Sequence, residues 1–291
     1  MNISTLSIMV GDSACNARCK YCISRTTFNI NKKNKLFVPS KALIEKAARV
    51  FAAGDGFTAL ITGKGEPALL PHQKLTNLIR ILYQYTPVVE LQTNGILLTD
   101  QLVKNYAQAG LSTVAISCAS SNDDFNFKVM ADGYGKRWHL ADKAKMVINN
   151  NLILRLTVIA QRGGIDSVNS FIKFVQWLKA LAPQNYPLQL TVRRMGLPSR
   201  HDLATERGQE VAKFVKANIV NTDPVWRYLQ KNGQKIITLP WGSEVFDYEG
   251  VAVCVSDCLT TRPEDDTIRS AILYPDGHLR YSWEYPGAVI F

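Results

Sequence analysis

Short apolar runs alternate with amphipathic segments along roughly the first 200 residues, and this alternation constrains the fold more than any other feature. The apolar runs have the length and the Val, Ile and Leu content of strands, and the segments between them have the 3.6-residue period of helices. Ser40, Thr99 and Asp166 are expected N-caps. The predicted strands cover residues 6–10, 57–62, 88–93, 113–117, 152–159 and 188–193, and the predicted helices end near Ala53, Tyr85, Gly110, Asn150 and Ala182.

This order predicts an α/β protein, because alternating strands and helices form parallel sheets joined by right-handed crossovers. About six units favour a partial (β/α)6 TIM-like barrel over residues 1–203, short of a full eightfold one. Residues 204–291 no longer alternate and predict a small α+β appendage with two helices and short antiparallel strands. Within it, Pro-Asp-Gly between two apolar runs predicts a hairpin over residues 271–281.

One face of several predicted strands is polar, with Glu90, Gln92, Arg155, Gln189 and Arg193 at alternating positions. The interior of a packed barrel is mostly Val, Ile and Leu. Because polar groups are costly to bury without partners, we expect this face to line a lumen that binds a ligand. Alternatively, the polar faces point outward from an open sheet.

The loop after the first predicted strand contains Cys15, Cys19 and Cys22 in the spacing C-x3-C-x2-C. A structural zinc site would need a fourth ligand, and the next histidine along the chain is His72. Three cysteines are enough for a [4Fe-4S] cluster that keeps one iron open. Three buried apolar cysteines are the alternative, and a disulfide framework does not fit a chain without secretory features.

This spacing, with Tyr21 directly before the last cysteine, resembles the signature of the radical S-adenosylmethionine (radical SAM) enzymes. The resemblance implies a [4Fe-4S] cluster on Cys15, Cys19 and Cys22, with S-adenosylmethionine chelated at the open iron and Tyr21 beside it. It also implies reductive cleavage to a 5′-deoxyadenosyl radical that abstracts hydrogen from a substrate. The electron would come from a donor such as flavodoxin or ferredoxin.

The second predicted strand ends in Thr62-Gly-Lys-Gly-Glu-Pro67, which is similar to the family's Gly-x-Gly-Glu-Pro motif. Two glycines let backbone approach a ligand closely, and barrel active sites lie at this end of the strands. The resemblance assigns Gly63, Gly65, Glu66 and Pro67 to S-adenosylmethionine. Taken alone, the same residues would also suit an ordinary turn.

Four further strands add candidate residues. Asn94, in a Thr-Asn-Gly sequence, and Ser117 match family positions that contact S-adenosylmethionine, while Cys118 is expected in the core. Arg155 needs a carboxylate partner, which is either that of the cofactor or that of Glu66 or Glu90. Arg193 is a candidate for binding an anionic substrate, or it contacts solvent.

Cys254 and Cys258 precede the predicted hairpin in the appendage. This arrangement loosely resembles the auxiliary-cluster (SPASM or twitch-like) appendages of peptide-modifying radical SAM enzymes and of the molybdenum-cofactor cyclase. Those relatives place another cysteine after the hairpin, where this chain has Tyr281-Ser-Trp283. The alternatives are a second cluster and an appendage without one that shapes the substrate pocket.

The net charge of +10 favours an anionic partner, although solvated lysines would give the same total. The Lys-rich residues 29–35 are either a loop or a phosphate-binding patch. No run is long enough to span a membrane and no signal peptide is evident, so we expect a cytoplasmic protein. The predicted substrate is an anionic small molecule, a nucleic acid or a peptide.

A different function class also fits part of the sequence. A non-catalytic iron–sulfur or zinc module that binds nucleic acid or senses redox state would account for the charge and for Cys254 and Cys258. It would have no use for the polar strand faces or for the Gly-Lys-Gly-Glu-Pro turn. Binding of S-adenosylmethionine distinguishes the two hypotheses.

Overall fold

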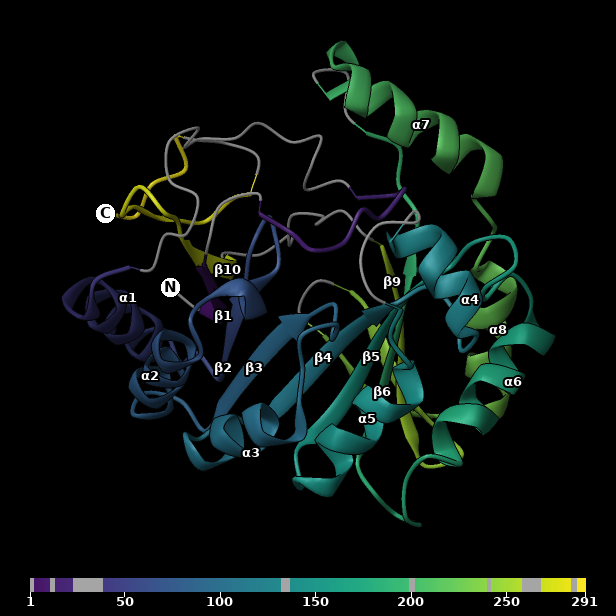
Figure 1. The fold of residues 1–291 in the computed structure, drawn as a ribbon, viewed down its shortest axis with the longest axis horizontal. Helices are drawn as coiled ribbons and strands as arrows, with labels where there is room; N and C mark the ends of the chain where they lie inside the picture. The colour runs from purple at the N-terminus through teal and green to yellow at the C-terminus, as the bar shows by residue number, and fades with distance from the viewer. Residues whose placement is uncertain are drawn as a thin grey trace.

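A single curved sheet runs through the molecule, with helices along its outer side (Figure 1). The structure is a computed structural model that describes residues 3–10, 14–22, 39–131, 137–198, 202–239, 242–257, 268–283 and 287–291. The Lys-rich residues 29–35 and Cys258 lie outside these ranges. The strands are β1 (Ile3–Met9), β2 (Thr58–Thr62), β3 (Val88–Thr93), β4 (Thr113–Cys118), β5 (Ile153–Ile159), β6 (Leu188–Arg194), β7 (Gln234–Thr238), β8 (Glu244–Tyr248), β9 (Val251–Asp257), β10 (Ile268–Leu273) and β11 (Leu279–Arg280).

The helices follow the predicted alternation with β1 to β6, which confirms the α/β class and the partial barrel. None of them, within the described ranges, is long and apolar enough to cross a membrane. They are α1 (Lys41–Ala53), α2 (His72–Tyr83), α3 (Asp100–Gln108), α4 (Asp123–Asn126), α5 (Leu140–Asn149), α6 (Val168–Lys179), α7 (Glu206–Asn218) and α8 (Asp223–Asn232), with short 3-10 turns at Pro67–Leu69 and Asp202–Ala204 and a π-helical turn at Phe127–Ala131.

The sheet of the described residues has the order β11-β10-β1-β2-β3-β4-β5-β6-β9-β8-β7. Every neighbouring pair from β10 to β9 is parallel. The antiparallel pairs are at the two edges: β10 with β11 at one edge, and β9 with β8 and β8 with β7 at the other. The hairpin predicted over residues 271–281 is therefore confirmed.

The antiparallel strands predicted for the C-terminal part are confirmed, but β9 and β10 also pair with barrel strands, which the prediction did not include. Strand β9 pairs in parallel with β6, and β10 pairs in parallel with β1. Both continue the barrel sheet at its edges, because each needs a neighbour for its backbone hydrogen bonds and the barrel edges are free. The division of the chain at residue 203 stays a prediction.

One of the three predicted N-caps, Asp166, is wrong by one residue. Ser167, not Asp166, is the N-cap of α6, and its hydroxyl accepts a hydrogen bond from the backbone N–H of Ser170. The Asp166 carboxylate instead accepts from the backbone N–H of Gly163 and from the Ser170 hydroxyl. Ser40 and Thr99 cap α1 and α3 as expected.

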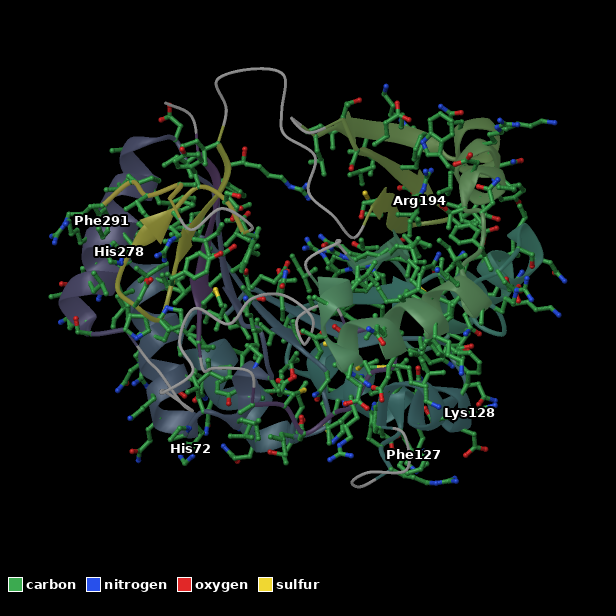
Figure 2. All side chains as sticks on the ribbon, turned by 90° about the horizontal axis from the view of Figure 1, so that it is seen from above. His72, Phe127, Lys128, Arg194, His278 and Phe291 are labelled. Carbon is green, nitrogen blue, oxygen red and sulfur yellow. The ribbon has the colours of Figure 1, made fainter. Side chains whose placement is uncertain are left out.

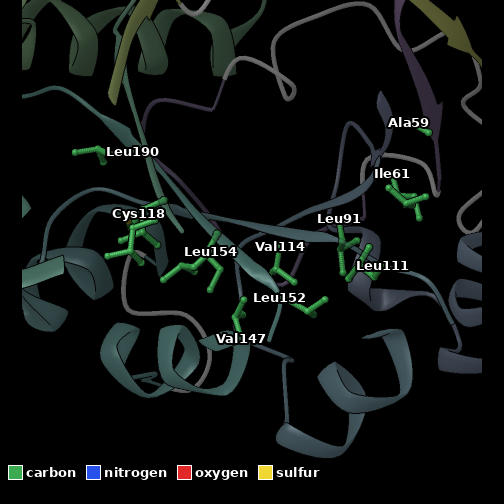
Figure 3. Close-up of a cluster of buried hydrophobic side chains, with 14 of the residues drawn as sticks. Ala59, Ile61, Leu91, Leu111, Val114, Cys118, Val147, Leu152, Leu154 and Leu190 are labelled. Atoms are coloured by element: carbon green, nitrogen blue, oxygen red, sulfur yellow. The ribbon is translucent and has the colours of Figure 1, made fainter. Parts of the chain in front are cut away.

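The two faces of the barrel strands differ in burial. On β5, Leu154, Leu156 and Val158 are fully buried and belong to one large apolar core that continues under the helices (Figure 3). Cys118 of β4 is 1% exposed in the same core, as predicted. The alternate residues Arg155 and Thr157 are only half-buried. The polar strand faces therefore point inward and keep contact with solvent.

Candidate iron–sulfur and cofactor site

The cysteine loop lies across the C-terminal ends of the barrel strands. Cys15, Cys19 and Cys22 are each half-buried. The backbone N–H of Arg18 donates to the Met130 carbonyl at 2.7 Å, and that of Lys20 donates to Val129 at 3.0 Å. The π-helical turn after α4 thus fixes the cysteine loop through backbone hydrogen bonds.

Asn94 connects the end of β3 to the same loop. Its side-chain amide donates to the side-chain oxygen Oδ1 of Asn16 at 2.7 Å and points to the Cys15 sulfur at 3.8 Å. The backbone N–H of Ala17 also donates to this sulfur, at 3.4 Å. Hydrogen bonds to ligand sulfurs set the potential of iron–sulfur clusters, so the surroundings of Cys15 suit a thiolate ligand.

The Gly-Lys-Gly-Glu-Pro turn is also hydrogen-bonded to the cysteine loop. The backbone N–H of Glu66 donates to the Ala14 carbonyl at 2.8 Å. Gly63 lies against the end of β1, where a Cβ atom would be 2.6 Å from the Val10 carbonyl oxygen. This glycine is therefore required by close backbone packing directly before the cysteines.

Replacing Gly63 by Ala is expected to lower the midpoint of thermal unfolding. The added methyl group must displace the backbone of Val10, and overpacking of this kind costs about 1–3 kcal/mol. Gly287→Ala is the control, since a Cβ there would meet nothing within 4 Å. Equal midpoints for Gly63→Ala and the native protein would contradict the packing role.

The Glu66 carboxylate turns toward the end of β3. One oxygen accepts from the Thr93 hydroxyl at 2.5 Å and from the Ala68 N–H at 2.9 Å, and the other accepts from the Asn94 N–H at 2.7 Å. Glu66 is 6% exposed. Burial raises the pKa of this carboxyl group, although the three hydrogen bonds act in the opposite direction. Glu66 thus joins the turn to the strand that supplies Asn94.

Helix α7, which follows the barrel in sequence, covers the cysteine loop. Arg207 of α7 donates to the Cys19 carbonyl at 3.1 Å. Tyr21 packs in an apolar cluster with Val211 and Val215 of the same helix. Figure 1 shows α7 apart from the helices on the outer side of the sheet. The sequence predicted this helix but gave no sign of its contact with the loop, which joins residues far apart in the chain.

The other predicted site residues lie on the inner face of the sheet. Ser117 is half-buried near the end of β4. Arg155 forms an ion pair with Glu90, one of the partners left open by the sequence, and its Nε donates to Gln189 at 2.7 Å. Gly65 and Pro67 lie in the turn with Glu66, and Pro67 begins a 3-10 turn. The structure thus brings the predicted residues to one side of the sheet, with Arg155 deeper than the rest.

Gln161 is a candidate that sequence reasoning missed. It follows β5, is 0% exposed, and neither its amide nitrogen nor its carbonyl oxygen has a hydrogen-bond partner among the described residues. It lies near Ala119 at the end of β4, since both residues approach Gly164. A buried amide without a partner is costly. The only sign of Gln161 in the sequence was that it is a polar residue just after the end of a strand.

The arrangement fits a [4Fe-4S] cluster better than a single metal ion. No three His, Cys, Asp or Glu side chains in the described part of the chain are placed to hold one ion. The three cysteines of a [4Fe-4S] cluster bind different iron atoms. In the C-terminal part, Cys254 is half-buried on β9, and a second cluster with Cys258 stays a prediction.

Comparisons with known proteins agree with these features. Residues 12–161 match the family described as the Radical SAM superfamily. The chain is 28% identical over 178 residues to the GTP 3′,8-cyclase of Campylobacter lari, covering 58% of this chain and 50% of that one. It is 27% identical over 139 residues to the uncharacterized protein MJ0103 of Methanocaldococcus jannaschii, covering 42% and 32%. This chain therefore aligns with half or less of each curated relative.

Solved structures show the same fold. Streptococcus suis SuiB bound to S-adenosylmethionine superposes with a TM-score of 0.63 at 13% identity, covering 98% of this chain and 61% of that one. The anSMEcpe protein with bound AdoMet gives a TM-score of 0.56 at 14% identity, covering 98% and 75%. Because both superpositions cover nearly the whole chain, the shared fold includes the part after residue 203.

Proposed function

This chain belongs to the radical SAM superfamily, and we propose that it abstracts hydrogen from an organic substrate held over the inner face of its sheet. The superfamily's cofactors are a [4Fe-4S] cluster and S-adenosylmethionine. The observation that best supports the proposal is the hydrogen-bonded unit of the cysteine loop, the glycine-rich turn and Asn94. A structural cluster would not need to face a polar, solvated sheet.

Each part of this unit has a defined task in the proposal. Cys15, Cys19 and Cys22 hold the cluster, which together with S-adenosylmethionine supplies a 5′-deoxyadenosyl radical when both are bound. The turn from Gly63 to Pro67 positions the amino end of the cofactor, and Asn94 and Ser117 contact it from neighbouring strands. Tyr21 and α7 keep water from the loop. The protein thus orients the cofactor and shields its chemistry.

The substrate is proposed to be a nucleotide, a nucleic acid or a peptide. One sequence relative is named for its action on GTP, and one structural relative was solved bound to the precursor peptide SuiA. The net charge of +10 and the inward arginines favour an anionic molecule in either class.

The test is anaerobic reconstitution with iron and sulfide, followed by reduction in the presence of S-adenosylmethionine. We expect 5′-deoxyadenosine to form, and the paramagnetic resonance signal of the reduced cluster to change when the cofactor is added. A non-catalytic iron–sulfur or zinc module would bind no S-adenosylmethionine and leave the signal unchanged. That outcome would overturn the proposal.

Gln161→Met is expected to stabilise the fold and weaken the binding of S-adenosylmethionine. Methionine has a similar size and has no amide. Removing a buried amide that has no partner among the described residues should raise the free energy of unfolding by about 1–3 kcal/mol. If the amide binds the cofactor, affinity should fall by about tenfold. Thermal unfolding and equilibrium dialysis measure the two effects.

Opposite signs for stability and affinity would mark Gln161 as a binding residue. Ser112→Ala is the control, because Ser112 precedes β4 at the other end of the strands and donates to the Val89 carbonyl. It should leave the affinity unchanged. Native affinity in Gln161→Met would remove Gln161 from the site.

A further inference from the structure

The inner face of β5, β6 and β9 is polar and open to solvent. Along β6, Leu188, Leu190 and Val192 are buried in the core, whereas Gln189, Thr191 and Arg193 alternate with them and are half-buried. The register pairs Thr191 with Cys254 and Arg193 with Ser256 on β9. The same alternation on β9 therefore places the Cys254 side chain on the inner face, between the levels of Arg155 and Arg193.

Arg155 lies farther from the C-terminal ends of the strands than Arg193 does, and it already has a negatively charged partner. It pairs with Glu90, which is only 1% exposed, and Gln92 donates to the other Glu90 oxygen at 3.0 Å. Gln189 accepts from Arg155 Nε at 2.7 Å. Both oxygens of Glu90 therefore have partners, and Arg155 already balances the charge of this carboxylate.

Arg193 has no such partner in the part of the chain that the structure describes. Its Nε is buried without a hydrogen-bond acceptor among the described residues, and it forms no ion pair with any of them. The next residue, Arg194, points to the opposite face and binds Asp223 of α8 at 2.8 Å; Figure 2 labels it. A guanidinium group held partly out of water without a counter-ion is costly.

A second cation lies close to Arg193. Arg269 of β10 comes from the other edge of the barrel, and burial and the charge of Arg193 both lower its pKa. The positive charges of Arg193, Arg155 and Arg269 all lower the pKa of the Cys254 thiol. Burial has the stronger effect and raises this pKa. Arg193 and Arg269, which come from opposite sides of the barrel sheet, are therefore close enough for their charges to act on each other and on Cys254.

We propose that Arg193 and Arg269 bind an anionic group of the substrate, a carboxylate or a phosphate, against the inner face of the barrel. Guanidinium groups bind both anions through paired N–H donors. An anion there would neutralise the repulsion between the two arginines and satisfy Arg193. The proposal rests on the proposed function, and it specifies an anionic substrate whose charged end lies beside Cys254.

Calorimetric titration of the reconstituted protein with inorganic pyrophosphate and with succinate tests this site. We expect binding of at least one probe, weakened about tenfold or more in Arg193→Gln and in Arg269→Gln. Arg194→Gln makes the same charge change at the adjacent position and should bind like the native protein. Preference for pyrophosphate would indicate a phosphate group, and preference for succinate a carboxylate.

Two outcomes would overturn the site. Equal weakening in Arg193→Gln and Arg194→Gln would mean that only net charge matters. Displacement of the probe by S-adenosylmethionine would assign the arginines to the cofactor. Cofactor binding and 5′-deoxyadenosine formation are measured separately on the same samples. Anion binding without that product would therefore refute the proposed function and leave the anion site standing.

Discussion

Cys15→Ala is expected to abolish formation of 5′-deoxyadenosine and leave the barrel folded. Cys15 is the thiol approached by both the Ala17 N–H and the Asn94 amide, and a three-cysteine cluster has no spare ligand in this loop. Iron should fall from about four per chain toward none after reconstitution. Circular dichroism and the unfolding midpoint check the fold, which rests on a core distant from the loop.

Cys118→Ala is the matched control for this prediction. Cys118 is a buried core thiol, and burial raises its pKa far above the usual range, so it is inert. The Cys118→Ala protein should contain as much iron as the native protein and form 5′-deoxyadenosine equally well. Native activity in Cys15→Ala would refute the ligand assignment.

The same iron determination tests the C-terminal cysteines. About eight irons per chain, falling to about four in Cys254→Ala, would establish a second cluster. About four in both proteins would mean that Cys254 binds no cluster.

Local patterns were enough to predict most of the barrel. Ser40 and Thr99 cap their helices because a hydroxyl before an amphipathic segment can accept from the first turn, and that rule acts within four residues. The alternating polarity of β5 and β6 gave the inward face in the same way. At Asp166 the rule was one residue off, since Ser167 competes for the same position.

Long-range pairing could not be predicted from those patterns. Strand β9 lies beside β6, and β10 beside β1, only because the barrel leaves two edges unpaired. Apolar alternation looks the same in parallel and antiparallel edge strands. The contact of Arg207 with Cys19 and the isolated amide of Gln161 depend on packing between distant segments. The residues that carry the proposed chemistry could therefore be predicted from the sequence, whereas the long-range contacts that hold them in place could not.

Glu66→Ala is expected to destabilise the protein by about 3–5 kcal/mol. The change leaves the Thr93 hydroxyl and the Asn94 and Ala68 N–H groups without their acceptor, and each buried orphaned donor costs about 1–3 kcal/mol. Thr93 and Asn94 are 3% and 6% exposed, so solvent replaces the carboxylate poorly. The unfolding free energy, measured by urea titration, gives the size of the effect.

Glu45→Ala on α1 is the control, because Glu45 forms only a long i,i+4 pair with Lys41 at 3.7 Å and should cost less than about 1 kcal/mol. The pH dependence adds a second check. With a folded pKa raised above its unfolded value, Glu66 contributes stability that is complete below pH 4.5 and is lost as the pH rises through the folded pKa.

Glu66→Gln should therefore lack this fall in stability with rising pH, while the native protein shows it. The substitution should also loosen Asn94, whose N–H then loses an acceptor and whose side chain holds Asn16 and approaches Cys15. We thus expect cluster retention to fall together with stability in Glu66→Ala, and less so in Glu66→Gln. A Glu66→Ala protein of native stability, with its cluster fully retained, would show that the turn and β3 are held together by other contacts.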